Sequence, residues 1–260
     1  NLDDKEREQM ILAIETSTPV CSVALTPNTR SVWEKRIEGR GVHSERLFTF
    51  TDELLDRAGA GIEDLDAVLF SRGPGSYTGL RIGASAIKGF LYGRRVPFYT
   101  FPTLLSFSAG LTLGAKPHTI YSVIDARRQH LYLQRFDWDG TELVQTNNAA
   151  VTPIADIERE INDRFQENKH FRPIVVGTGW ERLTLERGVM EHDPNLLSDI
   201  DEPGVDTRVK TFGSEYISAK SLIKAWEDPT LKEMFLKEDP QQFDPDYLEI
   251  AQANNSNLDR

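Results

Sequence analysis

Residues 15–19, Glu-Thr-Ser-Thr-Pro, form a polar turn between two apolar runs. In nucleotide-binding folds, the backbone N–H groups and hydroxyls of such a turn bind phosphate oxygens, and a neighbouring carboxylate holds a metal ion through water. Glu15, Thr16 and Ser17 are therefore candidate nucleotide-binding residues. Turns of Ser and Thr are also common where the hydroxyls bind only their own backbone. Taken by itself, this sequence favours the ordinary β-turn.

A glycine-rich loop between a predicted strand and a predicted helix is the second candidate. Residues 71–83 read SRGPGSYTGLRIG, and Gly73, Pro74 and Gly75 predict a sharp turn. The first N–H groups of the following helix could bind an anion. However, the loop lacks a Gly-Lys-Ser/Thr ending and does not match the G-x-G-x-x-G spacing. It therefore predicts a nucleotide site only weakly.

The helix predicted after this loop has two adjacent apolar faces. Glycine inside a helix costs up to about 1 kcal/mol relative to alanine, which is tolerated where two backbones approach closely. The glycine-containing face therefore predicts a close contact with another helix, and the period does not decide whether that helix belongs to this chain or to another subunit. The bulky face consists of Leu80, Ala84, Ile87 and Leu91, and the small face consists of Gly79, Gly83, Ala86 and Phe90.

Two further turns could contact anions. In residues 175–180, VVGTGW, Gly177 and Gly179 could leave room for a purine ring or a pyrophosphate, although tight strand-to-helix packing explains them equally well. Residues 125–129, Asp-Ala-Arg-Arg-Gln, contain no glycine and two cations that could pair with an anion.

The sequence contains no pattern of catalytic or metal-binding residues. Its five histidines include no pair at the i, i+4 spacing of an H-E-x-x-H site, and no serine lies in a G-x-S-x-G elbow. The single Cys21 lies in an alternating apolar run, where a reduced thiol behaves as a small hydrophobe. We therefore assign no catalytic residue and no metal.

Composition limits the class of protein. The chain of 260 residues carries a formal net charge of −11, which argues against a nucleic-acid surface built by this chain alone. A single cysteine excludes an intrachain disulfide. The first residues, NLDDKEREQ, lack the apolar core of a signal peptide, and no run of about 18 apolar residues is present. These features predict a cytoplasmic protein without membrane contact.

The order of the predicted elements indicates two α/β lobes. The first contains strands at 10–14, 20–25 and 31–37, a helix from Ser44 to about Ala58, a strand at 66–70, a helix at 78–92 and a strand at 96–101. The pattern restarts with a helix at 102–113, strands at 119–125 and 130–138, a helix at 154–165, a strand at 173–177 and a helix at 213–226. The repeated hairpin around a polar turn suggests an internal duplication. We place the first lobe at 10–104, the second at 105–250, flexible tails at 1–9 and 251–260, and irregular structure at 186–209.

Several motifs, in this order, resemble the bacterial TsaB (YeaZ) family. They are ILAIETSTPVCSVAL, HSERL before a helix, FSRGPGSYTGLRIGASAIKG, VIDARRQHLY and VVGTGW, and residues 244–248 resemble the closing Pro-x-Tyr-Leu element of that family. The glycine-rich motif is the most specific of them. The resemblance implies an α/β, two-lobed actin-like ATPase (ASKHA, ribonuclease H-like) fold, with each lobe built on an antiparallel hairpin in a mixed sheet.

The resemblance also implies a role in forming N6-threonylcarbamoyladenosine at position 37 of tRNAs that read codons beginning with A. In that system the paralogous TsaD subunit transfers the threonylcarbamoyl group, TsaB holds and activates TsaD, and the small ATPase TsaE joins them. This chain would then be a scaffold without activity alone, paired with a TsaD-type paralogue as a heterodimer or with itself as a homodimer. It would contact tRNA only through the complex. No cofactor is expected, and ATP or ADP at a subunit interface stays open.

Family members pair through first-lobe helices, which implies partner contacts for the glycine-rich segment. Glu15 replaces the Asp of many members, which disfavours nucleotide hydrolysis here, and Glu249 replaces a common Arg. The alternative is an actin-like small-molecule kinase or ATPase with Mg-ATP between the lobes, although neither turn has the Asp-x-Gly-Thr/Ser pattern of such enzymes. The predicted partner interface is Gly73, Pro74, Gly75, Thr78, Gly79, Arg81, Gly83, Ala86 and Phe90, and the vestigial nucleotide site is Glu15, Thr16, Ser17, Gly177 and Gly179.

Overall fold

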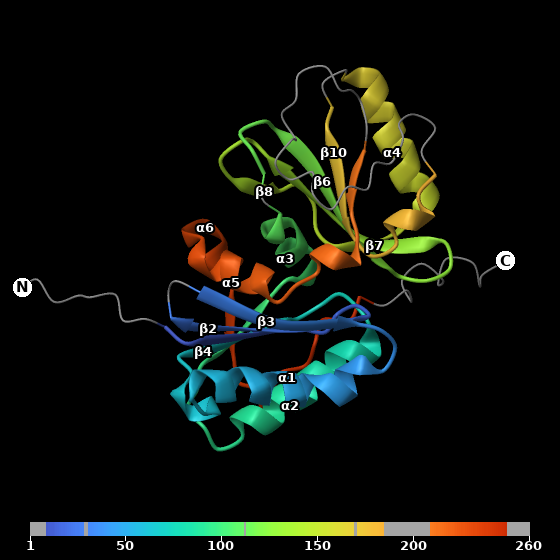
Figure 1. The fold of residues 1–260 in the computed structure, drawn as a ribbon. Coiled ribbons are helices and arrows are strands. Elements are labelled where there is room, and N and C mark those ends of the chain that lie inside the picture. Colours follow the sequence, from blue (N-terminus) through green and yellow to red (C-terminus); the bar gives the residue numbers. More distant parts are fainter. Residues whose placement is uncertain (1–8, 29–30, 112, 169–170, 185–208, 249–260) are drawn as a thin grey trace, which may run out of the picture.

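Two β-sheets with helices on both faces form the part of the chain that the computed structural model describes, residues 9–28, 31–111, 113–168, 171–184 and 209–248 (Figure 1). In the first sheet, β1 and β4 are parallel, β4 and β5 are parallel, and the other neighbouring strands are antiparallel. In spatial order its strands are β12 (Leu236–Glu238), β5 (Phe98–Phe101), β4 (Ala67–Ser71), β1 (Ile11–Glu15), β2 (Val20–Asn28) and β3 (Ser31–Glu38).

The second sheet repeats this arrangement. Its central hairpin is antiparallel, and a parallel strand flanks the first strand of the hairpin, as β4 flanks β1. The matching order supports the predicted internal duplication. In spatial order the strands are β11 (Lys210–Phe212), β10 (Pro173–Gly177), β6 (His118–Asp125), β7 (His130–Trp138) and β8 (Leu143–Gln145), and β9 (Ala150–Pro153) also pairs with β7.

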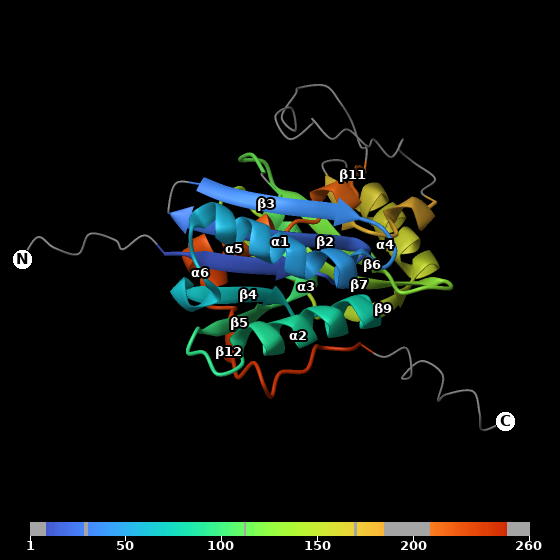
Figure 2. The ribbon, with the colours of Figure 1, turned by 60° about the horizontal axis from the view of Figure 1, so that its bottom comes forward.

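The helices lie in three layers around the two sheets (Figures 1 and 2). The outer face of the first sheet carries α1 (Val42–Ala58) and α2 (Tyr77–Leu91), and the outer face of the second carries α4 (Ile154–Glu167). Between the sheets lie α3 (Thr103–Gly110), α5 (Lys220–Glu227) and α6 (Pro229–Lys232). Short 3-10 turns occur at Ile62–Asp64, Trp180–Arg182 and Ser214–Tyr216. Within the described ranges, no helix has the length and apolar character needed to cross a membrane.

Three apolar clusters fill the spaces between these layers. Because side chains alternate along a strand, β1 sends Leu12 and Ile14 to the cluster under α1 and α2, and Ala13 to the cluster between the sheets. In β6, Tyr121 and Val123 likewise belong to the cluster under α4. Both sheets are thus buried on both faces, which explains why their central strands read as continuous apolar runs.

Most of the predicted elements form, and three helices differ in extent. Helix α3 ends at Gly110, before the predicted end at 113. Helix α1 begins at Val42 after Gly41, whose φ is +74°, and Ser44 lies inside the helix instead of capping it. The helix predicted at 213–226 is divided into the turn Ser214–Tyr216 and α5. The division has a tertiary cause, because the N–H of Ala219 donates to the Ser22 hydroxyl at 2.8 Å and so bonds to the first sheet.

The C-terminal part of the chain returns to the first sheet. Strand β12 lies within the range predicted as the second lobe, yet it pairs antiparallel with β5. The residues that follow it run beside β5 and α2 (Figure 2). The sequence boundary at residue 105 therefore does not separate the two sheets. The predictions for residues 186–208, for Glu249 and for the tail at 251–260 lie outside the described residues.

An arginine of β3 joins the first sheet to the segment that leads into α5. Arg36 donates through Nε to the carbonyl oxygen of Ile217 at 3.0 Å and through Nη2 to that of Ser214 at 2.5 Å. Two backbone acceptors at the end of a 3-10 turn are thereby satisfied by a charged donor, which makes stronger hydrogen bonds than a neutral donor. The two lobes are tied together at this point.

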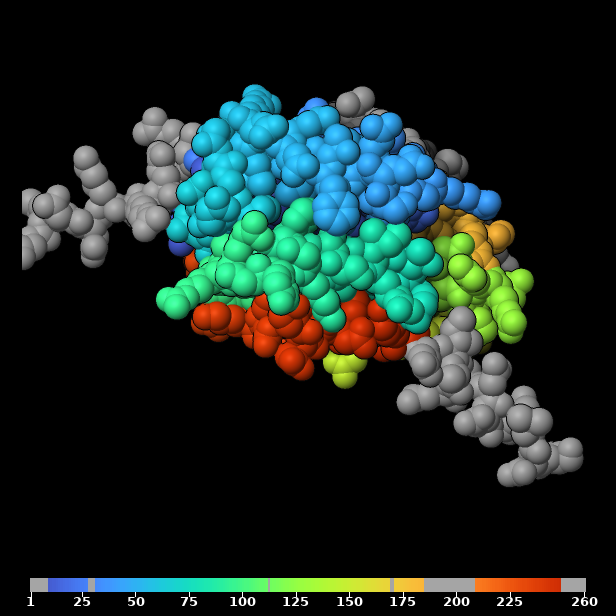
Figure 3. Space-filling view, turned by 90° about the horizontal axis from the view of Figure 1, so that it is seen from below, coloured from blue at the N-terminus to red at the C-terminus, as the bar shows by residue number. Residues whose placement is uncertain are grey.

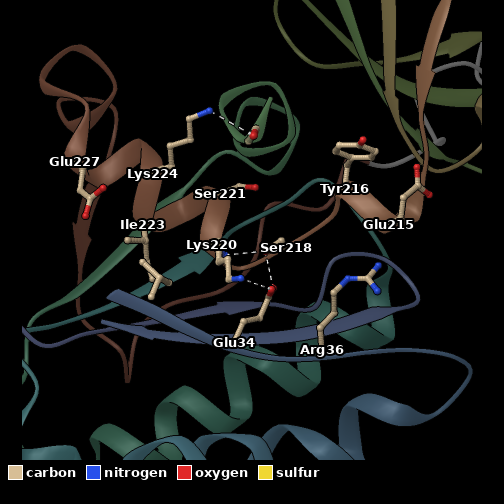
Figure 4. A pocket seen from close by; sticks show the side chains of 12 residues that line it. Glu34, Arg36, Glu215, Tyr216, Ser218, Lys220, Ser221, Ile223, Lys224 and Glu227 are labelled. Carbon is tan, nitrogen blue, oxygen red and sulfur yellow. Dashed lines mark hydrogen bonds and ion pairs between the residues drawn. The ribbon is translucent and has the colours of Figure 1, made fainter. Parts of the chain in front are cut away.

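A second group of hydrogen bonds lies beside it. Oε1 of Glu34 accepts from the Ser22 hydroxyl at 2.7 Å and from the Ser218 hydroxyl at 2.5 Å. Oε2 of Glu34 lies 3.4 Å from Nζ of Lys220 (Figure 4). The Ser22 hydroxyl also accepts the Ala219 N–H. One carboxylate and one hydroxyl therefore link two strands of the first sheet to the start of α5.

We predict that Arg36→Met lowers the free energy of unfolding by about 1–3 kcal/mol, because the carbonyls of Ser214 and Ile217 lose a charged donor. Urea titration measures the change. The control is Lys35→Met, whose ion pair with Glu53 at 2.6 Å is about half exposed and should contribute less than about 1 kcal/mol. Equal effects of the two substitutions would contradict the interlobe role of Arg36.

Candidate partner and nucleotide sites

The turn between β1 and β2 is buried beneath the glycine-rich loop. Glu15, Thr16, Ser17 and Thr18 are each at most 1% exposed. The loop is joined to the turn by a hydrogen bond from the N–H of Ser76 to the carbonyl oxygen of Ser17 at 2.6 Å. The residues predicted to bind phosphate therefore face the protein's own loop.

Three glycines permit this close approach. A Cβ at Gly75 would lie 2.4 Å from the carbonyl oxygen of Ser17, and one at Gly79 would lie 2.1 Å from that of Thr16. A Cβ at Gly83 would lie 2.5 Å from Oγ1 of Thr16. Real Cβ atoms do not approach other heavy atoms so closely, so only glycine fits at these positions. The backbone of the loop and of α2 therefore packs directly against Thr16 and Ser17.

The carboxyl group of Glu15 is satisfied within the same turn. Its Oε1 accepts from the N–H of Ser17 at 2.6 Å and from the Ser17 hydroxyl at 2.5 Å, and its Oε2 accepts from the Ser71 hydroxyl. Burial raises the pKa of Glu15, and the hydrogen bonds from Ser17 and Ser71 partly oppose this effect. The carboxyl group is thus buried and bound by the turn and by the end of β4.

The glycines predicted in the second lobe also serve packing. A Cβ at Gly177, whose φ is +120°, would lie 1.9 Å from the carbonyl oxygen of Val123 in β6. At Gly179, whose φ is +91°, it would lie 2.8 Å from Cδ2 of Leu131 in β7 and 3.2 Å from Cα of Asp125. These two positions contact the second hairpin, whereas Glu15, Thr16 and Ser17 contact α2 and its loop.

The small-residue face of α2 points inward. Gly79 and Gly83 contact the first turn, Ala86 is 2% exposed, and Gly73 and Pro74 are also buried. The predicted close contact exists, but it joins α2 to a turn of its own chain and not to another helix. These five residues therefore do not form an exposed surface, because their faces are covered within the chain, and their role at a partner interface stays a prediction.

The opposite side of α2 is exposed beside α1. Tyr77 is 57% exposed, with the guanidinium of Arg81 5.2 Å from its ring centroid, and Thr78 is also exposed. Phe48 of α1 is 48% exposed, and its ring centroid lies 5.1 Å from that of Phe90. Figure 3 shows α1 and α2 side by side across this face. We call these five residues, Phe48, Tyr77, Thr78, Arg81 and Phe90, the helix surface.

The C-terminal segment fixes the glycine-rich loop from outside, which sequence reasoning missed. Phe243 fills the cluster under α1 and α2, and Asp246 forms an ion pair with Arg72 at 3.0 Å. The N–H of Asp246 also donates to the carbonyl oxygen of Arg72 at 2.7 Å. A Cβ at Gly73 would lie 2.3 Å from the carbonyl oxygen of Asp246. The resemblance to the Pro-x-Tyr-Leu element identified this segment as a family motif, but it did not predict where the segment packs.

A pocket of about 390 Å³ lies at the joint between the lobes, with Val32 among its lining residues (Figure 4). Most of its charged groups are engaged with one another or with backbone. Lys220 pairs with Glu34, and Nζ of Lys224 donates to the carbonyl oxygen of Leu111 at 2.5 Å. Burial lowers the pKa of Lys224. Elsewhere too, the described residues contain no group of three His, Cys, Asp or Glu side chains that could hold a metal ion.

We predict that Gly79→Ala destabilises the protein by about 1–3 kcal/mol, because its Cβ would meet the Thr16 carbonyl oxygen, a backbone atom that cannot move freely. Thermal unfolding measures the loss. The control is Gly89→Ala in the same helix, where no atom lies within 4 Å of the new Cβ. That substitution should stabilise the helix by about 0.5–1 kcal/mol. A neutral result for Gly79→Ala would contradict the packing described above.

The raised pKa of Glu15 predicts a pH-dependent stability. Because the folded pKa lies above the ordinary value of 4.5, the protonated form contributes stability that is complete below pH 4.5 and is lost as the pH rises through the folded pKa. Glu15→Gln stays neutral at every pH. Urea titrations should therefore show that the wild type loses stability relative to this variant as the pH rises above 4.5. A difference independent of pH would refute the burial of an ionisable group here.

The sequence is similar to a protein-family model and to curated proteins. A protein-family model described as "TsaD: tRNA N6-adenosine threonylcarbamoyltransferase" matches residues 40–189. The tRNA threonylcarbamoyladenosine biosynthesis protein TsaB of Haemophilus influenzae is 31% identical over 175 residues, 65% of this chain and 72% of that protein. The protein of the same name in Escherichia coli is 28% identical over 190 residues, 72% and 80% of the respective chains.

A solved structure confirms the predicted fold. YeaZ from Pseudomonas aeruginosa superimposes with a TM-score of 0.65 at 23% identity, over 92% of this chain and 100% of that chain. With two sheets of matching strand order and helices between them, the chain has the two-lobed actin-like architecture. The family resemblance of the sequence motifs is confirmed as well, and this chain belongs to the TsaB (YeaZ) family.

Proposed function

We propose that this chain is a non-catalytic scaffold that activates a TsaD-type paralogue in forming N6-threonylcarbamoyladenosine in tRNA. The relatives at 31% and 28% identity are named for the biosynthesis of this nucleoside, which supports the pathway. The observation that carries the scaffold role is the first turn, which is filled by Gly75, Gly79 and the start of α2. An ATPase of actin-like fold would need this turn for phosphate.

The hydrogen bonds of the first turn and of the joint between the lobes agree with a non-catalytic role. Glu15 is 1% exposed and accepts three hydrogen bonds from Ser17 and Ser71, so its carboxyl group is not open to a metal-bound water from solvent. The hydrogen bonds of Arg36 and Glu34 tie the lobes together and oppose the cleft closure that small-molecule kinases use. A nucleotide in the complex would therefore bind at a subunit interface, next to this chain and not inside its first lobe.

The helix surface is the proposed site for the paralogue. It combines exposed aromatic rings at Phe48 and Tyr77 with the guanidinium of Arg81, which are the residue types enriched at protein interfaces. The TsaD family model matches a range that includes α1 and α2, so a paralogue would carry comparable helices. Helices of the two subunits could then pack together, and a second copy of this chain could use the same surface when the paralogue is absent.

A TsaE-type ATPase completes the proposed complex, and tRNA is bound mainly by the other subunits because this chain carries a net charge of −11. The test is reconstitution with the paralogue, the ATPase, threonylcarbamoyl-adenylate and tRNA. We predict modified tRNA only when this chain is present, and none from this chain alone. Full activity of the paralogue without this chain would refute the proposal.

A second prediction concerns the helix surface. Phe48→Glu should weaken binding to the paralogue by about 2 kcal/mol or more, roughly thirtyfold, because a charge would replace an exposed ring at the contact. Val144→Glu is the control, since Val144 is 45% exposed on β8 of the other lobe and should leave binding unchanged. Analytical ultracentrifugation gives both affinities. If Phe48→Glu bound as tightly as the control, the paralogue would have to bind elsewhere.

A further inference from the structure

The turn between β6 and β7 has an unusual backbone. Arg127 and Arg128 have φ angles of +69° and +51°, so two successive arginines adopt the left-handed conformation. Residues with long side chains rarely adopt positive φ, which Gly, Asn and Asp adopt more readily. Nothing in hairpin formation itself requires arginine at these positions. Strained residues of this kind are found mainly at functional sites.

Surrounding contacts hold the turn in this conformation. The carboxylate of Asp125 accepts from the N–H of Arg127 at 2.8 Å and from the guanidinium of Arg182. The N–H of His130 donates to the carbonyl oxygen of Arg127 at 3.2 Å, and the carbonyl of Gln129 accepts from the first residue of α4 at 2.9 Å. The two arginine backbones are therefore fixed by a neighbouring 3-10 turn and by a helix.

Within the described part of the chain, the two guanidinium groups have no carboxylate partner. Both side chains are exposed, and no described residue forms an ion pair or a side-chain hydrogen bond with either group. The chain has 41 acidic and 30 basic residues, so acidic partners are in excess. By contrast, Arg72, Arg135 and Arg182 each form an ion pair with a carboxylate. The turn thus presents two adjacent positive charges on a rigid support.

The position of the turn leaves it accessible in a complex. It lies at the tip of the β6–β7 hairpin in the second lobe, whereas the helix surface belongs to the first (Figure 1). Seen from the side of α1 and α2, the hairpin end lies at the margin of that face and not on it (Figure 3). A partner seated on the helix surface would leave the turn beside its edge.

We propose that the Arg127–Arg128 turn binds the phosphate backbone of the tRNA substrate, an inference that rests on the proposed function. Guanidinium groups bind phosphate oxygens through two parallel hydrogen bonds, and two neighbouring arginines match successive phosphates. An RNA is favoured over an acidic protein because the proposed reaction brings tRNA to this complex. Since the rest of the chain is acidic and repels RNA, this local contact would orient the tRNA as well as bind it.

The test uses the complete complex of this chain, the paralogue and the ATPase. In the variant Arg127→Asn with Arg128→Gly, two charges are removed and both positions receive residues that adopt positive φ readily. We expect the affinity for tRNA to fall about tenfold, and the slope of log affinity against log salt to become shallower by roughly 1.5–2. We also expect the melting temperature of the chain to rise by a few degrees, because backbone strain is relieved.

The matched control is Arg94→Gln with Arg95→Gln, which removes the same charge from another exposed pair. Its affinity for tRNA should stay within about twofold of the wild type. The proposal is overturned if the turn variant binds tRNA like the wild type, if the control loses as much affinity, or if the turn variant loses the paralogue or the ATPase instead, which would indicate a protein contact. Failure of the wild-type complex to modify tRNA would refute the proposed function itself.

Discussion

The packing of α2 against the turn between β1 and β2 determines what the first lobe can bind. Gly75, Gly79 and Gly83 bring the loop and helix backbones onto Thr16 and Ser17, within distances that exclude any side chain. The turn loses its access to solvent, and Glu15 must satisfy its oxygens with Ser17 and Ser71. The same packing directs the other side of α2 outward beside α1. Burial of the first turn and exposure of a helix pair are therefore two results of one contact.

The joint between the lobes extends this argument from the first lobe to the whole chain. In actin-like enzymes the two lobes close around a nucleotide, and catalysis depends on that motion. Here Glu34 and Arg36 of β3 bond directly to the segment that enters α5. The proposed scaffold role is compatible with such rigidity, because a surface that is already ordered avoids the entropy cost of ordering on binding.

Sequence patterns predicted the layers better than the contacts between them. The alternation and helical repeat of apolar residues, together with the glycines, predicted the β1–β2 hairpin, α2 and the end of α1 at Gly59. These features depend on residues that are close in the sequence. The patterns failed where a group distant in the sequence forms the contact. The N–H of Ala219 donates to the Ser22 hydroxyl, and the predicted last helix is interrupted there. The helical repeat of the sequence also identified the face of Gly79 and Gly83 as buried. It could not show which part of the chain covers that face.

The return of the chain to the first sheet has a consequence for the order of folding. Strand β12 completes an edge of the sheet, and Phe243 lies against Phe70 and Phe98 with ring centroids 5.9 Å and 5.3 Å apart. Residues near the C-terminus thus supply part of the core of the lobe that is synthesised first. During translation the N-terminal lobe must wait for the whole second lobe to emerge from the ribosome before its core can close, and contacts of such long sequence separation slow folding.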